Sequence, residues 1–183
     1  MPLSSRLTRR TAALALMLAA LAGCASNPTT SPTTPPVAAS EGASPSFTVS
    51  GAVGKRASFD LAALQALPTV TLTVGANTYT GVSLWTLLND SAVGLQPDTH
   101  VRNPVLSMYA LVSGSDGYRA VVSLGEIAPE FGNRTALLAL RMNGAPLGRN
   151  GVARLVVEGD LKPGRSVARV AAIEVIAAQP GAR

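Results

Sequence analysis

The chain of 183 residues contains one cysteine, one histidine and few aromatic side chains, which make up 4% of it. With Cys24 as the only thiol, no internal disulfide bond and no cysteine-rich zinc site can form. With His100 as the only imidazole, a metal site built from several histidines is excluded as well. These absences remove most hydrolytic metal chemistry, and we expect no metal site made of side chains.

Charged residues are also sparse, at 14% of the chain, although the formal net charge is +5. Of the 15 basic residues, Arg6, Arg9 and Arg10 belong to a leader that we expect to be removed, which leaves a net charge of about +2. The other basic residues are scattered, and few aromatic side chains are present on which bases could stack. Nucleic-acid binding is therefore not expected.

The first 23 residues consist of a basic start, an apolar run over 11–21 and an end of small residues. The apolar run is shorter than the ~20 residues that a helix needs to cross a bilayer. Residues 1–23 are therefore predicted to be an export signal and not a transmembrane anchor. Arg9-Arg10 partly resembles a twin-arginine signal, which leaves open whether the chain is exported unfolded or folded.

The leader ends in Leu21-Ala22-Gly23-Cys24, which resembles the bacterial lipobox. This resemblance implies that Cys24 is acylated, with palmitate among the chains, and becomes the new N-terminus. The alternative is an ordinary signal peptide that is cut nearby, with Cys24 incidental. Two or three acyl chains hold a protein stably on a membrane. Ala25-Ser26 resembles a signal for outer-membrane retention, so the expected location is the cell envelope, on the outer membrane facing the periplasm.

Residues 24–45 contain the predicted lipidated cysteine and a stretch of Ser, Thr, Pro, Ala and Gly in which Glu41 is the only charge. Such a composition buries too little apolar area to offset the entropy of ordering the chain. The stretch is predicted to be a tether between the membrane and a folded domain over 46–178.

From Ser46 onward, short β-rich runs alternate with glycine turns. Asp60 and Ser83 are predicted to cap helices over 61–67 and 84–93, and Ser123 a short helical turn. Asn143-Gly144 is a strong tight-turn signal. Strands are predicted over 47–53, 70–74, 78–81, 105–112, 118–122, 135–142, 152–158 and 167–176. Because long helices do not alternate with the strands, the predicted class is α+β with a mixed, mostly antiparallel sheet and two or three short helices.

Several short motifs follow one another in this domain. They are Asp60-Leu-x-x-Leu-x-x-Leu-Pro68, Tyr79-Thr-Gly-Val-Ser-Leu84, Ser115-Asp-Gly-Tyr118, Met142-Asn-Gly-Ala-Pro-Leu147, Gly151-Val-Ala-Arg154-Leu-Val-Val157 and Arg169-Val-x-x-Ile-Glu-Val175. In this order they resemble the oxidoreductase molybdopterin-binding domain, which has the sulfite oxidase fold. The resemblance covers nearly all of residues 46–176 and implies that fold, a molybdopterin cofactor and oxidoreductase chemistry.

The resemblance also implies roles for individual residues. Tyr118 matches a tyrosine that borders the active site, and its phenol suits the orientation of an oxyanion or water. Arg154 and Arg169 match the region that holds the phosphate of the pterin, and guanidinium groups suit phosphate. The alternatives are a tyrosine packed at the start of a strand and two solvated arginines. The family's histidine and tryptophan in this region are replaced by Asn150 and Val170.

The family's molybdenum-ligating cysteine lies on the strand after the first helix, where this chain has Val74 as the expected counterpart. Valine has no lone pair to offer a metal. Two functions therefore stay open. The first is a lipid-anchored, molybdopterin-dependent oxidoreductase whose thiolate comes from elsewhere or is dispensable. The second is a non-catalytic module of the same fold that recognises a small anion, a pterin-like ligand or an envelope protein.

Overall fold

The computed structural model of the protein describes residues 45–178. The predicted leader, the tether and Cys24 lie outside the described residues. Among the helices of residues 45–178, none combines the length and the apolarity needed to span a bilayer.

The described part of the chain is rich in β-strands and contains three short α-helices. The helices are α1 (Leu61–Gln65), α2 (Leu84–Asn89) and α3 (Leu124–Ile127). The first strands are β1 (Ser46–Gly51), β2 (Ala57–Asp60), β3 (Thr69–Val74), β4 (Asn77–Ser83) and β5 (Met108–Gly114). The others are β6 (Arg119–Ser123), β7 (Ala136–Met142), β8 (Ala145–Pro146), β9 (Arg154–Val157) and β10 (Val170–Ala177). Three 3-10 turns are η1 (Pro104–Ser107), η2 (Gly148–Asn150) and η3 (Pro163–Arg165).

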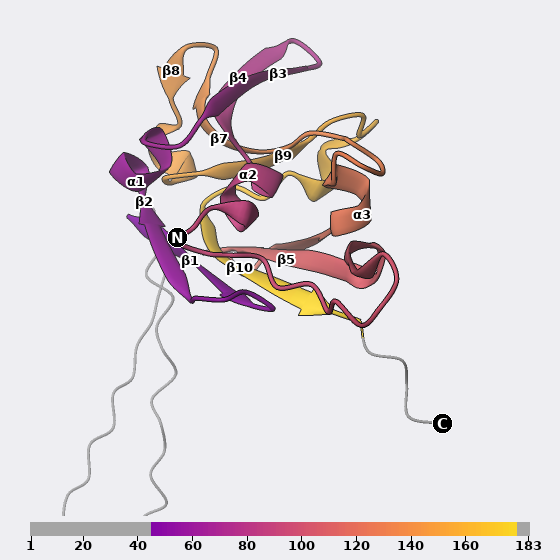
Figure 1. Ribbon diagram of the computed structural model, residues 1–183. Helices are drawn as coiled ribbons and strands as arrows, with labels where there is room; N and C mark the ends of the chain where they lie inside the picture. The colour runs from indigo at the N-terminus through magenta and orange to yellow at the C-terminus, as the bar shows by residue number, and fades with distance from the viewer. Residues whose placement is uncertain (1–44, 179–183) are drawn as a thin grey trace, which may run out of the picture. The chain divides into compact units, whose positions relative to one another are not determined.

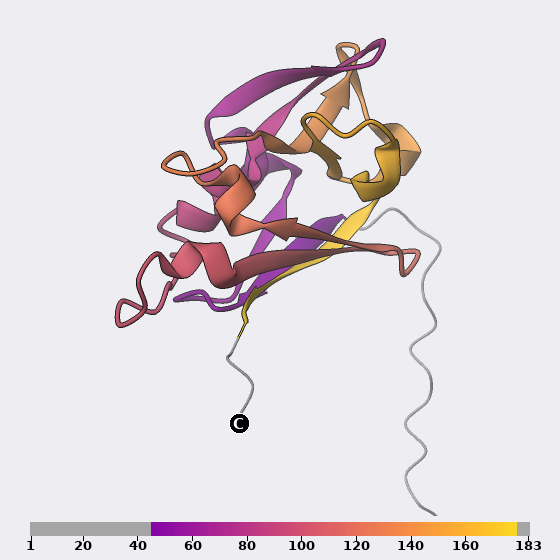
Figure 2. The ribbon, with the colours of Figure 1, turned by 90° about the vertical axis from the view of Figure 1, so that its right-hand side faces the viewer.

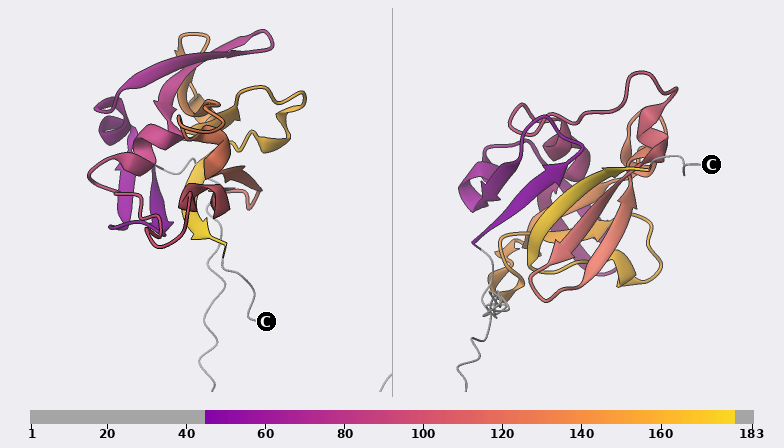
Figure 3. Two further views of the ribbon diagram at one scale, coloured as in Figure 1. Left: turned by 45° about the vertical axis from the view of Figure 1, so that its right-hand side comes forward. Right: turned by 90° about the horizontal axis from the view of Figure 1, so that it is seen from below.

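The strands form two five-stranded sheets, which Figures 1 and 2 show facing each other with α2 and α3 at the side of the space between them. Sheet 1 has the order β2-β1-β10-β5-β6, and its strands are seen side by side from below in Figure 3. In sheet 2, β3 pairs with β4, β4 with β7, and β7 with both β8 and β9. All pairs are antiparallel except β1 with β10, so the predicted mixed, mostly antiparallel α+β class is confirmed.

The main core lies between the two sheets. Its fully buried members include Val112 and Ile173 from sheet 1, Val82 and Leu138 from sheet 2, and Leu87 from α2. Because side chains alternate across a strand, the burial of every second residue of β5 and β6 places one face of sheet 1 in this core. No polar or charged residue within 45–178 is buried, so this core is apolar throughout.

Sheet 2 carries a second, smaller apolar cluster on its other face. Leu137 and Ala139 flank the core residue Leu138 on β7 and therefore point away from the main core. They are fully buried together with Leu72, Tyr79 and Val156, which are at most 9% exposed. This side of sheet 2 is thus covered as well, and it is here that the cavity described below lies.

Local signals in the sequence account for several element boundaries. The side chain of Asp60 accepts a hydrogen bond from the backbone N–H of Ala63 at 2.8 Å, which confirms the predicted cap of α1. Asn143 and Gly144 both have positive φ, 52° and 79°, as the predicted tight turn between β7 and β8 requires. Gly81 sits at a bulge between β4 and β7, where a Cβ would lie 2.0 Å from the carbonyl oxygen of Leu138.

Several predicted elements differ from the structure: the strand predicted over 167–176 begins only at Val170, and β2 and β8 were not predicted. The strand predicted over 105–112 begins only at Met108, because Pro104 starts the 3-10 turn η1, in which proline takes a first position where no N–H is needed. The helix predicted over 84–93 ends at Asn89, since Asp90 is extended and its carboxylate accepts from the N–H of Ala92. Ser83 stands at the N-cap of α2 without a side-chain hydrogen bond to the helix.

Candidate functional site

A cavity of about 320 Å³ opens on the covered face of sheet 2, between the β3–β4 hairpin and residues 160–166. We call it the hairpin cavity. Its lining includes Val74, Asn77, Tyr79, Val156, Asp160 and Ser166. Tyr79 and Val156 belong to the small apolar cluster, whereas Asn77, Asp160 and Ser166 bring polar groups. An apolar surface with a few polar groups is the usual composition of a small-molecule site.

Val74, the expected counterpart of the family's cysteine, is the last residue of β3 and lines this cavity. It pairs with Asn77 across a hairpin whose turn is Gly75-Ala76. Its half-buried side chain presents only methyl groups, so the position offers no metal ligand. No cysteine occurs within residues 45–178, and Cys24 lies outside them.

Arg154 lies at the start of β9, and its side chain holds Ser166 in place. Its Nε donates a hydrogen bond to the Oγ of Ser166 at 2.9 Å, and this hydroxyl donates to the carbonyl oxygen of Leu155 at 3.0 Å. Ser166 is thereby fixed on the wall of the hairpin cavity, while Arg154 itself is not among the residues that line it. The arginine acts on the cavity through the serine.

Arg169 lies immediately before β10, with a positive φ of 50°. Its guanidinium contacts the carboxylate of Asp116 at 3.1 Å, and the other oxygen of Asp116 accepts from the N–H of Tyr118 at 3.0 Å. These two hydrogen bonds, that from Tyr118 first and that from Arg169 second, lower the pKa of Asp116. Asp116 therefore shapes a turn, and Arg169 is engaged by a partner within the protein.

Tyr118, the predicted catalytic residue, is 49% exposed and precedes β6. Its phenol donates a hydrogen bond to the carbonyl oxygen of Gly164 in η3. Tyr118, Arg154 and Arg169 thus all contact residues 164–169 or belong to that segment. None of the three lines the hairpin cavity, and each uses its polar group in a contact inside the protein.

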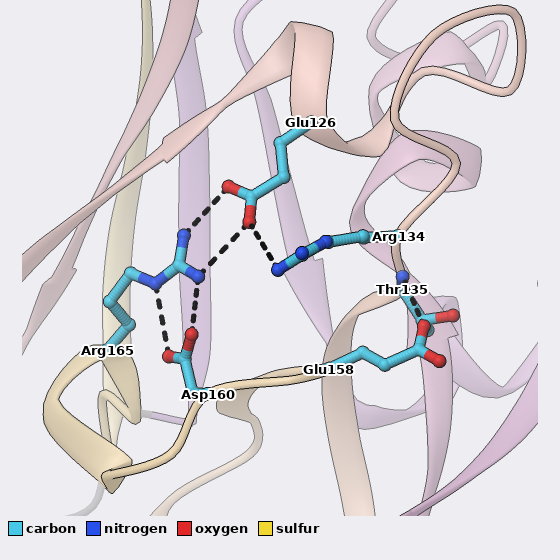
Figure 4. A network of polar contacts seen from close by, with 6 residues as sticks. All are labelled: Glu126, Arg134, Thr135, Glu158, Asp160 and Arg165. Atoms are coloured by element: carbon cyan, nitrogen blue, oxygen red, sulfur yellow. Dashed lines mark hydrogen bonds and ion pairs between the residues drawn. The ribbon is translucent and has the colours of Figure 1, made fainter.

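The strongest ionic contacts in the described part of the chain involve Arg165, which sequence reasoning did not single out (Figure 4). Its guanidinium donates to both oxygens of Glu126, at 2.8 and 3.2 Å, and to both oxygens of Asp160, with Nε at 3.1 Å from one of them. The hydrogen bonds that Arg165 donates, first to Asp160 and then to Glu126, raise the pKa of Arg165. This arrangement ties the cavity wall at Asp160 to helix α3.

Two further contacts extend this network (Figure 4). Arg134 reaches Glu126 at 3.6 Å but is 54% exposed, so water screens the pair. Glu158 accepts from the N–H of Thr135 at 2.8 Å, and hydrogen bonds from the backbone and side chain of Thr135 lower the pKa of Glu158. Nothing in the sequence spacing brings Glu126 and Arg165, 39 positions apart, into contact, so the network could not be read from the sequence.

The single histidine and the single tryptophan of the chain do not line the hairpin cavity. His100 is exposed in a loop, and its N–H donates to the side chain of Asp98. Trp85 is half-buried and packs against the main core. Within residues 45–178, no three His, Cys, Asp or Glu side chains gather closely enough to hold a metal ion.

The structure is similar to that of the sulfane dehydrogenase SoxCD from Paracoccus pantotrophus, with a TM-score of 0.55 and 18% sequence identity. The match covers 71% of this chain and 37% of that chain, so this chain corresponds to about a third of the dehydrogenase chain. No protein-family model and no curated protein sequence matches the chain. At this identity the similarity concerns the fold alone.

The molybdenum–pterin centre implied by the sequence resemblance does not fit the residues of this site. The position expected to supply a thiolate is Val74, and the described residues include no other sulfur ligand of that kind. The two arginines expected at the pterin phosphate are bonded to Ser166 and Asp116. The described residues therefore do not supply the thiolate or the free arginines that the resemblance implies.

Proposed function

We propose that this protein is a non-catalytic binding module of the sulfite oxidase-like fold, and that its hairpin cavity takes a small, uncharged heterocycle. A pterin is one such ligand, because its flat ring carries amino and N–H donors beside carbonyl and ring-nitrogen acceptors. The volume of about 320 Å³ lies at the lower end of the range of ~300–1,000 Å³ for ligand sites. Similarity in fold to a dehydrogenase supports a descent from oxidoreductases and no more.

One observation carries this proposal: the amide of Asn77, the carboxylate of Asp160 and the hydroxyl of Ser166 on the cavity wall are already held by internal hydrogen bonds. The carbonyl oxygen of Asn77 accepts from Asn143 at 2.9 Å. Asp160 is held by Arg165, and Ser166 by Arg154. Polar groups that are fixed before binding lose little entropy when a ligand arrives, as a recognition site requires.

The charges of the cavity argue against an anionic ligand. Asp160 contributes a carboxylate to its wall, and the cation that neutralises it, Arg165, is occupied by two acidic partners. A carboxylate accepts hydrogen bonds from amino and ring N–H groups but repels a phosphate. The small-anion alternative is thus disfavoured, and a neutral ring with donors is preferred.

The proposal also includes the site at which the module works. Cys24 is acylated in the cell envelope, and residues 25–45 tether the module to the outer membrane on its periplasmic side. The support for this part is the lipobox-like motif that ends in Cys24 and the composition of the residues that follow it. The role that we propose for the module is therefore to capture its ligand at a membrane surface.

Titration of the full chain with neopterin, a soluble fluorescent pterin, tests the proposed ligand class. We expect saturable quenching of the pterin fluorescence. Val74→Phe, which fills the cavity with a larger side chain, should weaken binding by about tenfold or more. Val121→Phe is the matched control, because Val121 is 49% exposed on β6 and should leave binding unchanged. Absence of saturation, or equal affinities of the Val74 variant and the parent chain, would refute the proposal.

A further inference from the structure

Strand β3 is an edge of sheet 2 that lacks the usual protection of an edge. Within residues 45–178 it pairs only with β4, and Figures 1 and 2 show the β3–β4 hairpin along the outer margin of the fold. Its sequence, Thr69-Val-Thr-Leu-Thr-Val74, contains no charge, no proline and no glycine. An unprotected edge presents free backbone N–H and C=O groups to any other strand.

The other edges of the two sheets are protected. Strand β2 ends in Asp60, and β6 begins with the exposed Arg119. On the far side of β7, β8 is two residues long and contains Pro146, while β9 begins with Arg154. The β3–β4 hairpin and its flanking residues also lack charge, since no charged residue occurs between Asp60 and Asp90. The open edge at β3 is therefore specific to this strand.

The two faces of β3 are chemically distinct and regular. Thr69, Thr71 and Thr73 lie on one face and are exposed. On the other face, Val70 is 41% exposed, Leu72 is buried and Val74 is half-buried. The threonines already pair in this way with β4, where the hydroxyl groups of Thr71 and Thr80 and of Thr73 and Thr78 are 3.4 Å apart.

We propose that β3 pairs with β3 of a second copy of this chain, antiparallel across a two-fold axis that passes through Thr71. In this register Thr69 faces Thr73 of the other copy, Thr71 faces Thr71, and Val70 faces Leu72. Threonine meets threonine on one face and apolar residues meet on the other, and no charges of like sign come together. Sheet 2 then continues from one copy into the next, and the exposed part of Val70 is covered.

This self-pairing does not depend on the ligand of the hairpin cavity. A single pair of strands buries less than the ~1,200 Å² of a standard stable interface, so the dimer is expected to be weak in dilute solution. Covalent trapping is the suitable measurement. Facing Cα atoms in an antiparallel pair are about 4.5–5.5 Å apart, within the range that a disulfide bond spans.

The experiment places Thr71→Cys in the full chain, followed by mild oxidation and non-reducing electrophoresis. A covalent dimer should form at about tenfold or more above the parent chain, in which Cys24 is the one cysteine. Ser123→Cys, which is also exposed and lies on edge strand β6, is the matched control and should stay at background. Circular dichroism verifies that each variant is folded.

A second pair of variants tests whether the edge itself is responsible. In the Thr71→Cys chain, Val70→Lys should reduce the dimer by about tenfold or more, because a lysine then faces an apolar residue of the partner. Val121→Lys, at 49% exposure on β6, should not change it. The proposal is overturned if the Thr71 and Ser123 cysteine variants behave alike, if both lysines act equally, or if Thr71→Cys is trapped with another protein instead.

Discussion

Replacing Arg165 by methionine removes the cation that joins the cavity wall to α3. Methionine keeps an unbranched apolar side chain, so the change mainly deletes the guanidinium. The carboxylates of Glu126 and Asp160 then lose the shared partner between them. Their side chains are only 23% and 18% exposed, so water restores just part of the lost interaction.

The expected loss in the free energy of unfolding depends on how deeply the ion pairs of Arg165 are buried. Removing one partner of a fully buried ion pair costs about 3–5 kcal/mol, whereas exposed pairs contribute about 0–1 kcal/mol. Arg165 itself is 29% exposed, which places this network between the two limits. We therefore expect Arg165→Met to lower the free energy of unfolding by about 2 kcal/mol.

Urea denaturation followed by circular dichroism measures this loss. Arg134→Met is the matched control, because Arg134 contacts the same Glu126 but is 54% exposed, and it should cost about 0.5 kcal/mol or less. If repulsion between the two carboxylates contributes, adding Glu126→Gln to Arg165→Met should restore part of the stability. Equal small losses for the two arginine variants would refute the argument.

Three other measurements test further parts of the account. Hydrogen bonds from Thr135 lower the pKa of Glu158 below its ordinary value of 4.5. The stabilisation by these bonds is complete above pH 4.5 and is lost as the pH falls through the pKa that Glu158 has in the folded chain. Glu158→Gln should thus have a lower free energy of unfolding than the parent chain at neutral pH, and the two values should converge in acid. A difference between them that does not change with pH would contradict this. Gly81→Ala should lower the free energy of unfolding by about 3 kcal/mol or more, since the added Cβ would lie 2.0 Å from the backbone carbonyl oxygen of Leu138. Gly75→Ala, with φ at +60° and open space around it, should cost only about 1 kcal/mol, and similar losses for the two alanines would be inconsistent with the bulge. Radioactive palmitate should label the parent chain in a bacterial host and not Cys24→Ser; labelling of the variant would exclude the lipobox interpretation.

Local signals were sufficient to predict most of the elements. The cap at Asp60 and the turn at Asn143-Gly144 depend on neighbouring residues, and both are present in the structure. One of the errors lies where two local preferences compete. The apolar run after Pro104 reads as a strand, but the proline starts a 3-10 turn first.

The candidate site was harder to predict, because its geometry depends on contacts between distant segments. The motifs drew attention to Arg154, Arg169 and Tyr118, and the structure brings their polar groups to residues 164–169 or to a turn beside them. Which partner each takes is a matter of packing, so the sequence does not reveal that Arg154 holds Ser166. Arg165 belongs to η3, between β9 and β10, and no motif or regular spacing in the sequence singles it out. It nevertheless makes the strongest ionic contacts of the described residues.

The most direct test of the central claim is the molybdenum content of the full chain, purified from a host that makes the molybdopterin cofactor. If Val74 leaves the site without a metal ligand, the parent chain should contain far less than one molybdenum per chain. Val74→Cys, which adds a thiol at the expected position of the family's ligand, provides the comparison under identical expression. About one molybdenum per parent chain, measured by mass spectrometry of the metal, would contradict the account.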